Sequence, residues 1–259
     1  MKKGLILFFL LVMMGIPGYA CYAATLKIWC SGGLMPVLQQ IAPDWQKRSG
    51  ILLDIEAAPS MGTTPQSIPQ RLAHHQRADV LVMVEDGMAP LVTQGKVAAE
   101  DKVALANSWI ALAVPAGDPV PDISTARNLR EVLLKSRRVA YSDSASGRYV
   151  SSHLYRKLGI ENVMRAKSQR IPATPVGTIL AERKADIGFQ QLSELRAVKG
   201  ITVVGLLPSS LQKATRYSAV VLKQSQQQAQ GRAFIRYLAS GDVARVIREK
   251  GMDPLAADY

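Results

Sequence analysis

The sequence contains none of the short motifs that mark the common catalytic and metal sites. It has no HExxH, CxxC, GxSxG or Walker loop, and its three histidines are His74, His75 and His153. His74 and His75 are neighbours on a predicted helix, so their side chains point in different directions. We therefore expect neither a metal nor another cofactor, and the motifs identify no catalytic residue.

Cysteine is almost absent, and only Cys21 and Cys30 are present. Cys21 follows an N-terminal Lys2-Lys3 pair and the uncharged run GLILFFLLVMMGI, which together have the form of a secretory signal peptide. This run is shorter than the roughly 20 residues of a membrane span, and no later stretch is long and apolar enough for one. The sequence thus predicts a signal peptide over residues 1–23 and a periplasmic protein.

The small residues before residue 24 place cleavage after Ala23, or after Ala24. The alternative is a lipoprotein acylated at Cys21, although the bulky Tyr19 is a poor match to that signal. Cleavage after Ala23 leaves Cys30 as the only cysteine, which excludes an intramolecular disulfide. The fold must then be held together by its apolar core.

Aromatic residues make up only 6% of the chain, while the formal charge is +12. A basic chain can indicate nucleic-acid binding. The export signal, the scattered charges and the lack of a stacking platform argue against it here. Two interpretations remain open, a solvated basic surface and a field that attracts small anions.

Strand and helix patterns alternate along the 236 residues that follow the predicted cleavage site. This alternation predicts an α/β fold with a mostly parallel sheet in each of two lobes. Predicted strands cover 26–30, 51–56, 78–84, 107–115, 138–141, 187–190, 203–206 and 217–222. Predicted helices cover 35–48, 65–75, 88–94, 129–134, 149–158, 178–183 and 228–250, the last with a break near Ser240-Gly241. Ligands of such sheets bind beyond the carboxyl ends of the strands.

Three predicted strands are followed by a loop rich in serine and glycine, at 30–33, 59–64 and 142–147. Hydroxyls and free N–H groups at helix starts favour anions, although the same residues also serve as ordinary helix caps. Arg148 follows the third loop and could grip a carboxylate or lie on the surface. Gln190-Gln191 ends a strand, where an amide can donate and accept.

Three groups near these loops could act as acid or base, namely Asp143, Tyr149 and Glu194. Solvation or helix capping is the competing interpretation for each of them.

The order of these features resembles the periplasmic molybdate-binding proteins of ABC transporters, within the type II substrate-binding fold. The resemblance rests on the stretches LKIWCSGGLMPVLQQIAPDWQKRSG, ADVLVMVEDGMAPLVTQGKV, ANSWIALAVPAG, YSDSASG, AERKADIGF and RAFIRYLASGDVARVIREKGM. It implies two lobes, 24–108 plus 219–259 and 109–218, around a central cleft. It also implies a monomer that hands a small anion to a membrane permease, with no nucleic-acid partner.

The resemblance also implies a set of ligand-binding positions. They are Ser31, Gly33, Ser60, Met61, Thr63, Thr64, Ser146, Gly147, Arg148, Val176 and Gln191. The tyrosine of molybdate binders falls on Gln191, and the loop after Ser60 is longer than in that family. Together with Arg148, these differences favour a ligand larger than molybdate.

We therefore expect a periplasmic binding protein for a small organic di- or tricarboxylate. The same superfamily includes a periplasmic aconitate isomerase, so an isomerase of small tricarboxylates is the alternative. Uptake of molybdate or tungstate is the third possibility.

Overall fold

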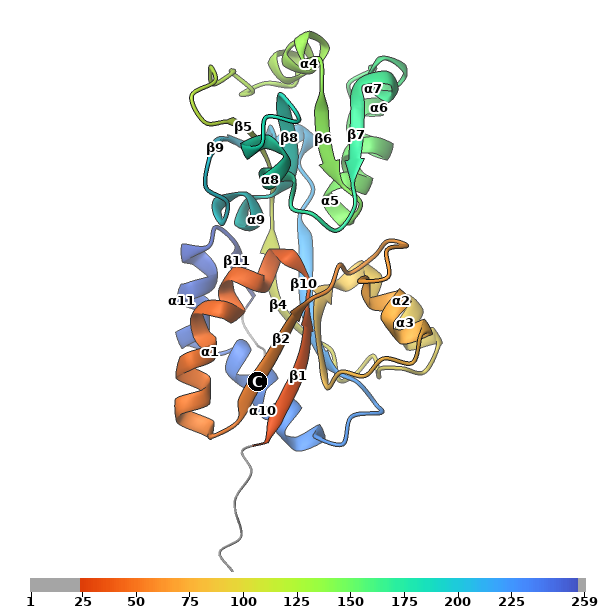
Figure 1. The fold of residues 1–259 in the computed structure, drawn as a ribbon, viewed down its shortest axis with the longest axis vertical. Coiled ribbons are helices and arrows are strands. Elements are labelled where there is room, and N and C mark those ends of the chain that lie inside the picture. The colour runs from red at the N-terminus through yellow and green to blue at the C-terminus, as the bar shows by residue number, and fades with distance from the viewer. Residues whose placement is uncertain (1–23, 256–259) are drawn as a thin grey trace, which may run out of the picture.

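The computed structural model describes residues 24–255, so the predicted signal peptide and Cys21 lie outside the described residues. Figure 1 shows two α/β lobes, each built on one sheet. In residues 24–255 we find no helix with the length and apolar content that a membrane crossing requires.

The first lobe is built on a six-stranded sheet in the order β11-β4-β10-β3-β1-β2. Its strands are β1 (Thr25–Cys30), β2 (Leu52–Ala57), β3 (Val80–Val84), β4 (Val103–Ser108), β10 (Thr215–Val221) and β11 (Asp253–Pro254). Its helices are η1 (Gly32–Leu34), α1 (Met35–Ser49), α2 (Ile68–Ala73), η2 (Glu85–Gly87), α3 (Ala89–Thr93), α10 (Gln228–Leu238) and α11 (Gly241–Glu249).

The second lobe is built on a five-stranded sheet in the order β7-β6-β8-β5-β9. Its strands are β5 (Ile110–Pro115), β6 (Val139–Ser142), β7 (Ser168–Ile171), β8 (Ile187–Gln191) and β9 (Ile201–Leu206). Its helices are α4 (Ala126–Lys135), α5 (Ala145–Tyr149), the π-helix η3 (Val150–Leu154), α6 (Tyr155–Lys157), α7 (Glu161–Lys167), α8 (Val176–Ala181), α9 (Leu192–Arg196) and η4 (Ser209–Leu211).

Both sheets are mixed, and the parallel pairing expected from the sequence is confined to three strands of each. β2, β1 and β3 are parallel in the first sheet, as are β7, β6 and β8 in the second. The other strands pair antiparallel, because they carry the chain between the lobes or return along an edge. Each lobe therefore offers three parallel strand ends from which site loops can project.

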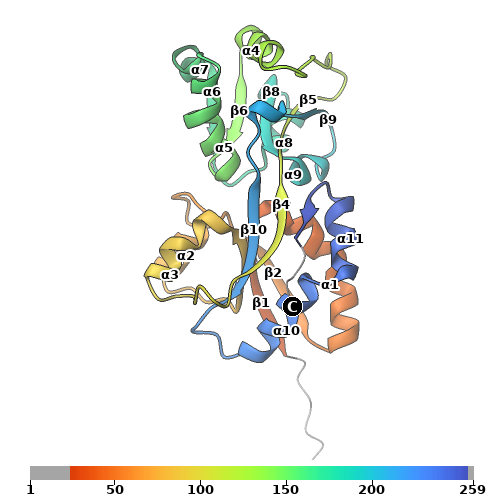
Figure 2. The same cartoon turned by 180° about the vertical axis from the view of Figure 1, so that it is seen from behind.

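Two segments of the chain connect the lobes. β4 ends at Ser108 and β5 begins at Ile110, so the single strand predicted over 107–115 is two strands separated by Trp109. The return segment leads through η4 into β10, and Figure 2 shows β10 beside β4, with which it pairs. The predicted boundary at 108/109 falls between β4 and β5, and that at 218/219 falls inside β10. The division into lobes at these residues remains our proposal.

Apolar side chains cover both faces of each sheet. Leu38, Ile41 and Trp45 are spaced to share one face of α1, and all three side chains are buried in the first core. Each such buried side chain contributes on the order of 1.5–3 kcal/mol relative to its exposed state. α1 ends at Ser49, and the next residue, Gly50, caps it with a left-handed φ of 70° that glycine adopts without strain. This packing holds β1, and hence the loop at 31–34, in place.

The second core fixes the strand ends of the other lobe. Leu112 of β5, Phe189 of β8 and Leu154 of η3 are fully buried in one cluster. The helix predicted over 149–158 forms earlier, at Ala145, and passes through the π-helix η3. π-Helical turns widen a helix locally and occur frequently at functional sites. Here the irregular turn follows directly on the loop at 142–147.

Candidate functional site

The carboxyl ends of the parallel strands of the two lobes face the same interlobe cleft. The loops after β1 and β2 come from the first lobe, and those after β6, β7 and β8 come from the second. Two cavities lie there, and both are lined by Ser142 and Asp143, so they meet at these two residues. This is the place where open α/β sheets bind ligands.

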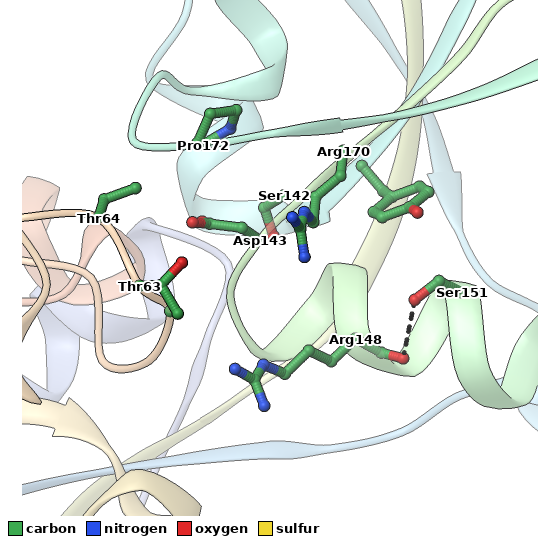
Figure 3. A pocket seen from close by; sticks show the side chains of 10 residues that line it. Thr63, Thr64, Ser142, Asp143, Arg148, Ser151, Arg170 and Pro172 are labelled. Atoms are coloured by element: carbon green, nitrogen blue, oxygen red, sulfur yellow. Dashed lines mark hydrogen bonds between the residues drawn. The ribbon is translucent and has the colours of Figure 1, made fainter.

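The first cavity, of about 490 Å³, is lined by hydroxyls and by two arginines. Its walls are Gly62, Thr63, Thr64, Tyr141, Ser142, Asp143, Arg148, Ser151, Arg170 and Pro172. Figure 3 shows Arg148 extending toward the loop that carries Thr63, while Arg170 lies beside Asp143. The predicted residues Thr63, Thr64 and Arg148 are therefore brought together, and they come from both lobes.

Arg148 and Arg170 provide the positive charge of this cavity. Within residues 24–255 neither guanidinium forms an ion pair with a carboxylate. Burial raises the pKa of Asp143, while Arg170 and Arg148 act to lower it, and the net shift is upward. Guanidinium groups bind carboxylates and other anions in bidentate fashion, so this cavity has the chemistry of an anion site.

Arg170 is missing from the predicted site residues. In the sequence it is one of many scattered basic residues, and nothing local distinguishes it. It reaches the cavity because β7 ends at Ile171, beside β6 and the loop at 142–147. This pairing between distant segments is not readable from a single sequence.

The loop that carries Thr63 and Thr64 is held by its own hydrogen bonds. Ser67 Oγ donates to the carbonyl oxygens of Thr64 and Gly62, at 2.9 and 3.1 Å. Gly62 has a φ of 109°, which only glycine adopts without strain, and a Cβ there would lie 3.0 Å from Asp143 Oδ2. Thr64 Oγ1 is buried and without a hydrogen-bond partner in the described part of the chain. The loop thus presents polar groups across the cleft from Asp143.

Ser60 and Met61 do not line either cavity, although they were predicted to bind the ligand. Ser60 is buried, and its Oγ accepts a hydrogen bond of 2.9 Å from the Val84 N–H. Met61 packs against the apolar core of the first lobe. Both residues lie at the start of the loop and pack into the protein. The residues of this loop that line the cavity begin at Gly62.

The second cavity, of about 320 Å³, is more apolar and is lined by two half-buried acids, Asp143 and Glu194. Its lining includes Ser31, Gly32, Met35, Ala58, Pro59, Ser142, Asp143, Ile171, Pro175, Gln190, Glu194 and Val198. Of the predicted ligand-binding positions only Ser31 lines it, and of the three candidate acids or bases Asp143 and Glu194 do. Glu194 lies in α9, one turn beyond the end of β8.

Glu194 reaches across the cleft to the first loop of the other lobe. A Cβ on Gly32 would lie 2.7 Å from Glu194 Oε2, so this approach depends on glycine. Gln190 Nε2 donates a hydrogen bond to the same oxygen. Burial raises the pKa of Glu194 to about 7, and the hydrogen bond from Gln190 only partly opposes this shift. A carboxyl group with a pKa near neutrality can both accept and return a proton.

A tyrosine occupies the space beside Gly33. The Tyr217 hydroxyl contacts Gly33 so closely that a Cβ there would collide with it, and Ser31 hydrogen-bonds the same hydroxyl. Burial, with Glu194 nearby, raises the pKa of Tyr217 well above its ordinary value, so the hydroxyl keeps its proton. Gly33 therefore makes room for Tyr217 and does not line a cavity. No pattern in the sequence indicated this tyrosine.

The loop after β6 forms a compact hydroxyl network. Ser142 Oγ and Ser146 Oγ lie 3.0 Å apart, and the Gly147 N–H donates to Ser142 Oγ at 3.3 Å. A Cβ on Gly147 would collide with the Ser142 carbonyl oxygen, so this position requires glycine. Ser146 and Gly147 are buried under the cavity floor and support Ser142, which lines both cavities.

Two further predicted positions are engaged with the protein itself. The Val176 N–H donates to Gln190 Oε1 at 2.8 Å. Gln191 Nε2 donates to Thr215 Oγ1 at 2.9 Å, and Gln191 lines neither cavity. Successive residues of a strand point to opposite faces, so Gln190 rather than Gln191 is directed at the cleft.

The fold and the comparisons define the class of protein. The family model of the bacterial extracellular solute-binding proteins matches residues 26–253, and the chain belongs to that family. The chain is 47% identical over 233 residues to an aconitate isomerase from a Pseudomonas species, covering 90% of this chain and 89% of that protein.

Solved structures confirm the type II fold and the predicted resemblance to molybdate-binding proteins. The periplasmic molybdate-binding protein of Azotobacter vinelandii superposes with a TM-score of 0.69 at 18% identity, over 88% of this chain and 98% of that one. L-Phospholactate-bound PEB3 of Campylobacter jejuni gives 0.68 at 14% identity, over 88% and 99%. At such identities the likeness establishes the fold alone.

Proposed function

We propose that this protein is a periplasmic isomerase of small tricarboxylates, which moves a proton between two carbons of aconitate. The observation that carries the proposal is Glu194, a half-buried carboxyl group with a pKa of about 7 that lines the cleft and has no cationic partner among residues 24–255. The 47% identity to an aconitate isomerase over nearly the whole chain supports the same activity.

The arginines of the first cavity supply the recognition of the substrate. Arg148 and Arg170 line the same cavity as Asp143 and have no carboxylate partner of their own among residues 24–255. Each guanidinium can hold one carboxylate in bidentate fashion, and the Thr63 hydroxyl can donate to a third. Aconitate carries three carboxylates on a three-carbon frame. The cavity is thus suited to a tricarboxylate in charge and in hydrogen-bonding capacity.

The reaction itself exchanges one proton and no electrons. Ionised Glu194 takes a proton from the methylene carbon, and the electron pair of that C–H bond spreads over the allylic system and its carboxylates. Glu194 then returns the proton to the other end of the allylic system, the double bond moves by one position, and the product forms as the cis or trans isomer. This chemistry requires that Glu194 is ionised and that its carboxylate lies within reach of the C–H proton. It does not require Glu194 to act as a nucleophile.

The test is an isomerisation assay on the mature chain with cis- and trans-aconitate, followed by proton NMR. The wild-type protein is expected to bring either isomer to the same mixture. Glu194→Gln removes the base and should lower the rate by about 10²–10⁴-fold. Glu182→Gln changes an exposed glutamate of the same lobe and serves as the matched control. An aconitate that binds to the wild-type protein and stays unchanged would refute the isomerase.

A carrier of small carboxylates is the second candidate, and the family supports it. Solute-binding proteins deliver their ligand to a membrane permease, here one of the ABC type, and the same cleft and arginines serve that role. Thermal-shift measurements with molybdate, tungstate, sulfate, citrate and both aconitates separate the possibilities. Stabilisation by aconitate without turnover indicates the carrier, and stabilisation by molybdate alone indicates oxyanion uptake.

A further inference from the structure

Gln190 connects a backbone group to the candidate base. It is the penultimate residue of β8 and only 3% exposed. Its Oε1 accepts from the Val176 N–H at 2.8 Å, which fixes the orientation of the amide. Because the carbonyl end is engaged there, the NH₂ end is directed at Glu194, where it donates to Oε2. The donor and acceptor ends of the Gln190 amide are therefore not interchangeable.

The two oxygens of Glu194 have different environments. Oε2 lies between Gln190 Nε2 and the backbone of Gly32. Oε1 accepts no hydrogen bond from residues 24–255. It is also not one of the side-chain polar atoms of that part of the chain that are both buried from solvent and without a hydrogen-bond partner. Since Glu194 lines the second cavity, Oε1 is the oxygen that a ligand in the cleft can reach.

We propose that Gln190 is a positioning residue. Its hydrogen bond keeps Glu194 Oε2 occupied as an acceptor, so that Oε1 is the oxygen that exchanges the proton with the ligand. The catalytic part of this inference, the proton exchange, rests on the proposed function. The geometry on which it stands belongs to the free protein and can be tested without turnover.

The other groups around Glu194 do not favour its ionised form. Tyr217 faces it from β10 and Cys30 from β1, and burial raises the pKa of both, so they are neutral at pH 7. Asp143 lines the same cavity from the loop after β6 and is itself an acid. Gln190 is accordingly the group in the described structure that stabilises the Glu194 carboxylate by direct donation.

Loss of the hydrogen bond from Gln190 should shift the pKa of Glu194 in one definite direction. A hydrogen bond to the charged form lowers the pKa of a carboxyl group, so its removal raises the pKa of Glu194. The base must be ionised to accept a proton, and the acidic limb of the kcat/KM profile therefore moves to higher pH. A purely structural role of Gln190 would lower stability and activity at every pH without moving this limb.

The experiment is a carbon-13 NMR titration of the glutamate side-chain carboxyls in the free protein, with Glu194→Gln used to assign the signal. Gln190→Met is expected to raise the Glu194 midpoint by about 0.5–1 pH unit. Gln190→Glu keeps an acceptor for the Val176 N–H but loses the amide donor, and should raise it further. Gln191→Met removes the neighbouring buried amide on the opposite face of β8 and should leave the midpoint in place.

The kinetic profile with aconitate then separates this inference from the proposed function. A raised midpoint with a parallel shift of the acidic limb supports both. A raised midpoint in a protein that never isomerises aconitate supports the role of Gln190 and refutes the isomerase. An unchanged midpoint in folded Gln190→Met or Gln190→Glu overturns the inference, whatever the activity.

Discussion

The two lobes place a glutamate just beyond the corresponding strand of each sheet and give it opposite surroundings. Glu85 follows β3, and its carboxylate accepts from Lys102 Nζ at 2.5 Å and from Ser218 Oγ at 2.8 Å. Glu194 follows β8, and in residues 24–255 it accepts one hydrogen bond, from the neutral amide of Gln190. The local plan of the sheets is shared, but only the first glutamate has a counter-ion.

The pKa values follow from this difference. Burial acts to raise the pKa of Glu85, but the hydrogen bonds from Lys102 and Ser218 outweigh it and the net shift is downward. Burial dominates at Glu194 and raises its pKa to about 7. Glu85 therefore stabilises the fold at neutral pH, whereas Glu194, the proposed base, is a carboxyl group whose ionisation opposes folding. Such opposition between stability and activity is common at active sites.

The largest effect is expected from replacing each glutamate with glutamine. The pKa of Glu194 rises from the ordinary glutamate value of 4.5 to about 7 on folding, so the wild type loses stability as the pH rises from 4.5 to 7. At about 1.4 kcal/mol per pH unit, the loss is up to about 3 kcal/mol. Glu194→Gln should therefore stabilise the protein at pH 8 and do little at pH 4.5, as measured by urea unfolding.

Glu85→Gln should act with the opposite sign. Its pKa is lowered by folding, so the stability it contributes is present at pH 8 and disappears as the pH falls below 4.5. The exposed Glu182→Gln provides the baseline at both pH values. If Glu194→Gln and Glu85→Gln shifted the unfolding free energy in the same direction at pH 8, the contrast between the lobes would be wrong.

Arg148 tests a second difference between the lobes, because both arginines of the first cavity come from the second lobe and the first lobe contributes Thr63 and Thr64. Removal of a guanidinium that holds a carboxylate leaves that charge unpaired. Arg148→Ala is expected to weaken aconitate binding by about 2 kcal/mol or more, which is about 30-fold in Kd. Calorimetric titration measures it, with the exposed Arg156→Ala of α6 as the control. An unchanged Kd would show that Arg148 faces solvent when the ligand is bound.

The fold could be predicted from the sequence because it rests on local patterns. The apolar face of α1, the buried run of β3 and the alternation of strands and helices are all readable in short windows, and the family resemblance supplied the order. The strand predicted over 107–115 divides at Trp109, because each half pairs with a different sheet. Pairing partners are long-range information that one sequence does not contain.

The site could be predicted only in part for the same reason. Thr63 and Thr64 lie in a loop that follows a strand and Arg148 comes directly after such a loop, which is where ligands bind, and all three line the first cavity. Glu194 was noticed in the sequence, but its burial depends on Gly32 from the other lobe. Ser60 and Gln191 have the right chemistry and are directed at the protein interior, where they bond Val84 and Thr215. Residue type indicated the chemistry, and tertiary packing determined which side chains reach the cavity.

The smallest effect is expected at the counter-ion of Glu85. Lys102 and Glu85 are about one-third and one-quarter exposed, and pairs of this kind contribute on the order of 0.5–1 kcal/mol. Lys102→Met should lower the unfolding free energy by that amount at pH 7 and raise the pKa of Glu85. The loss should shrink as the pH falls below 4.5 and Glu85 takes up its proton, while the exposed Lys135→Met should show no such dependence. An equal loss of unfolding free energy at pH 3 and pH 7 would show that Lys102 contributes through the packing of its aliphatic stem. The contrast between Glu85 and Glu194 would then rest on the hydrogen bond from Ser218 alone.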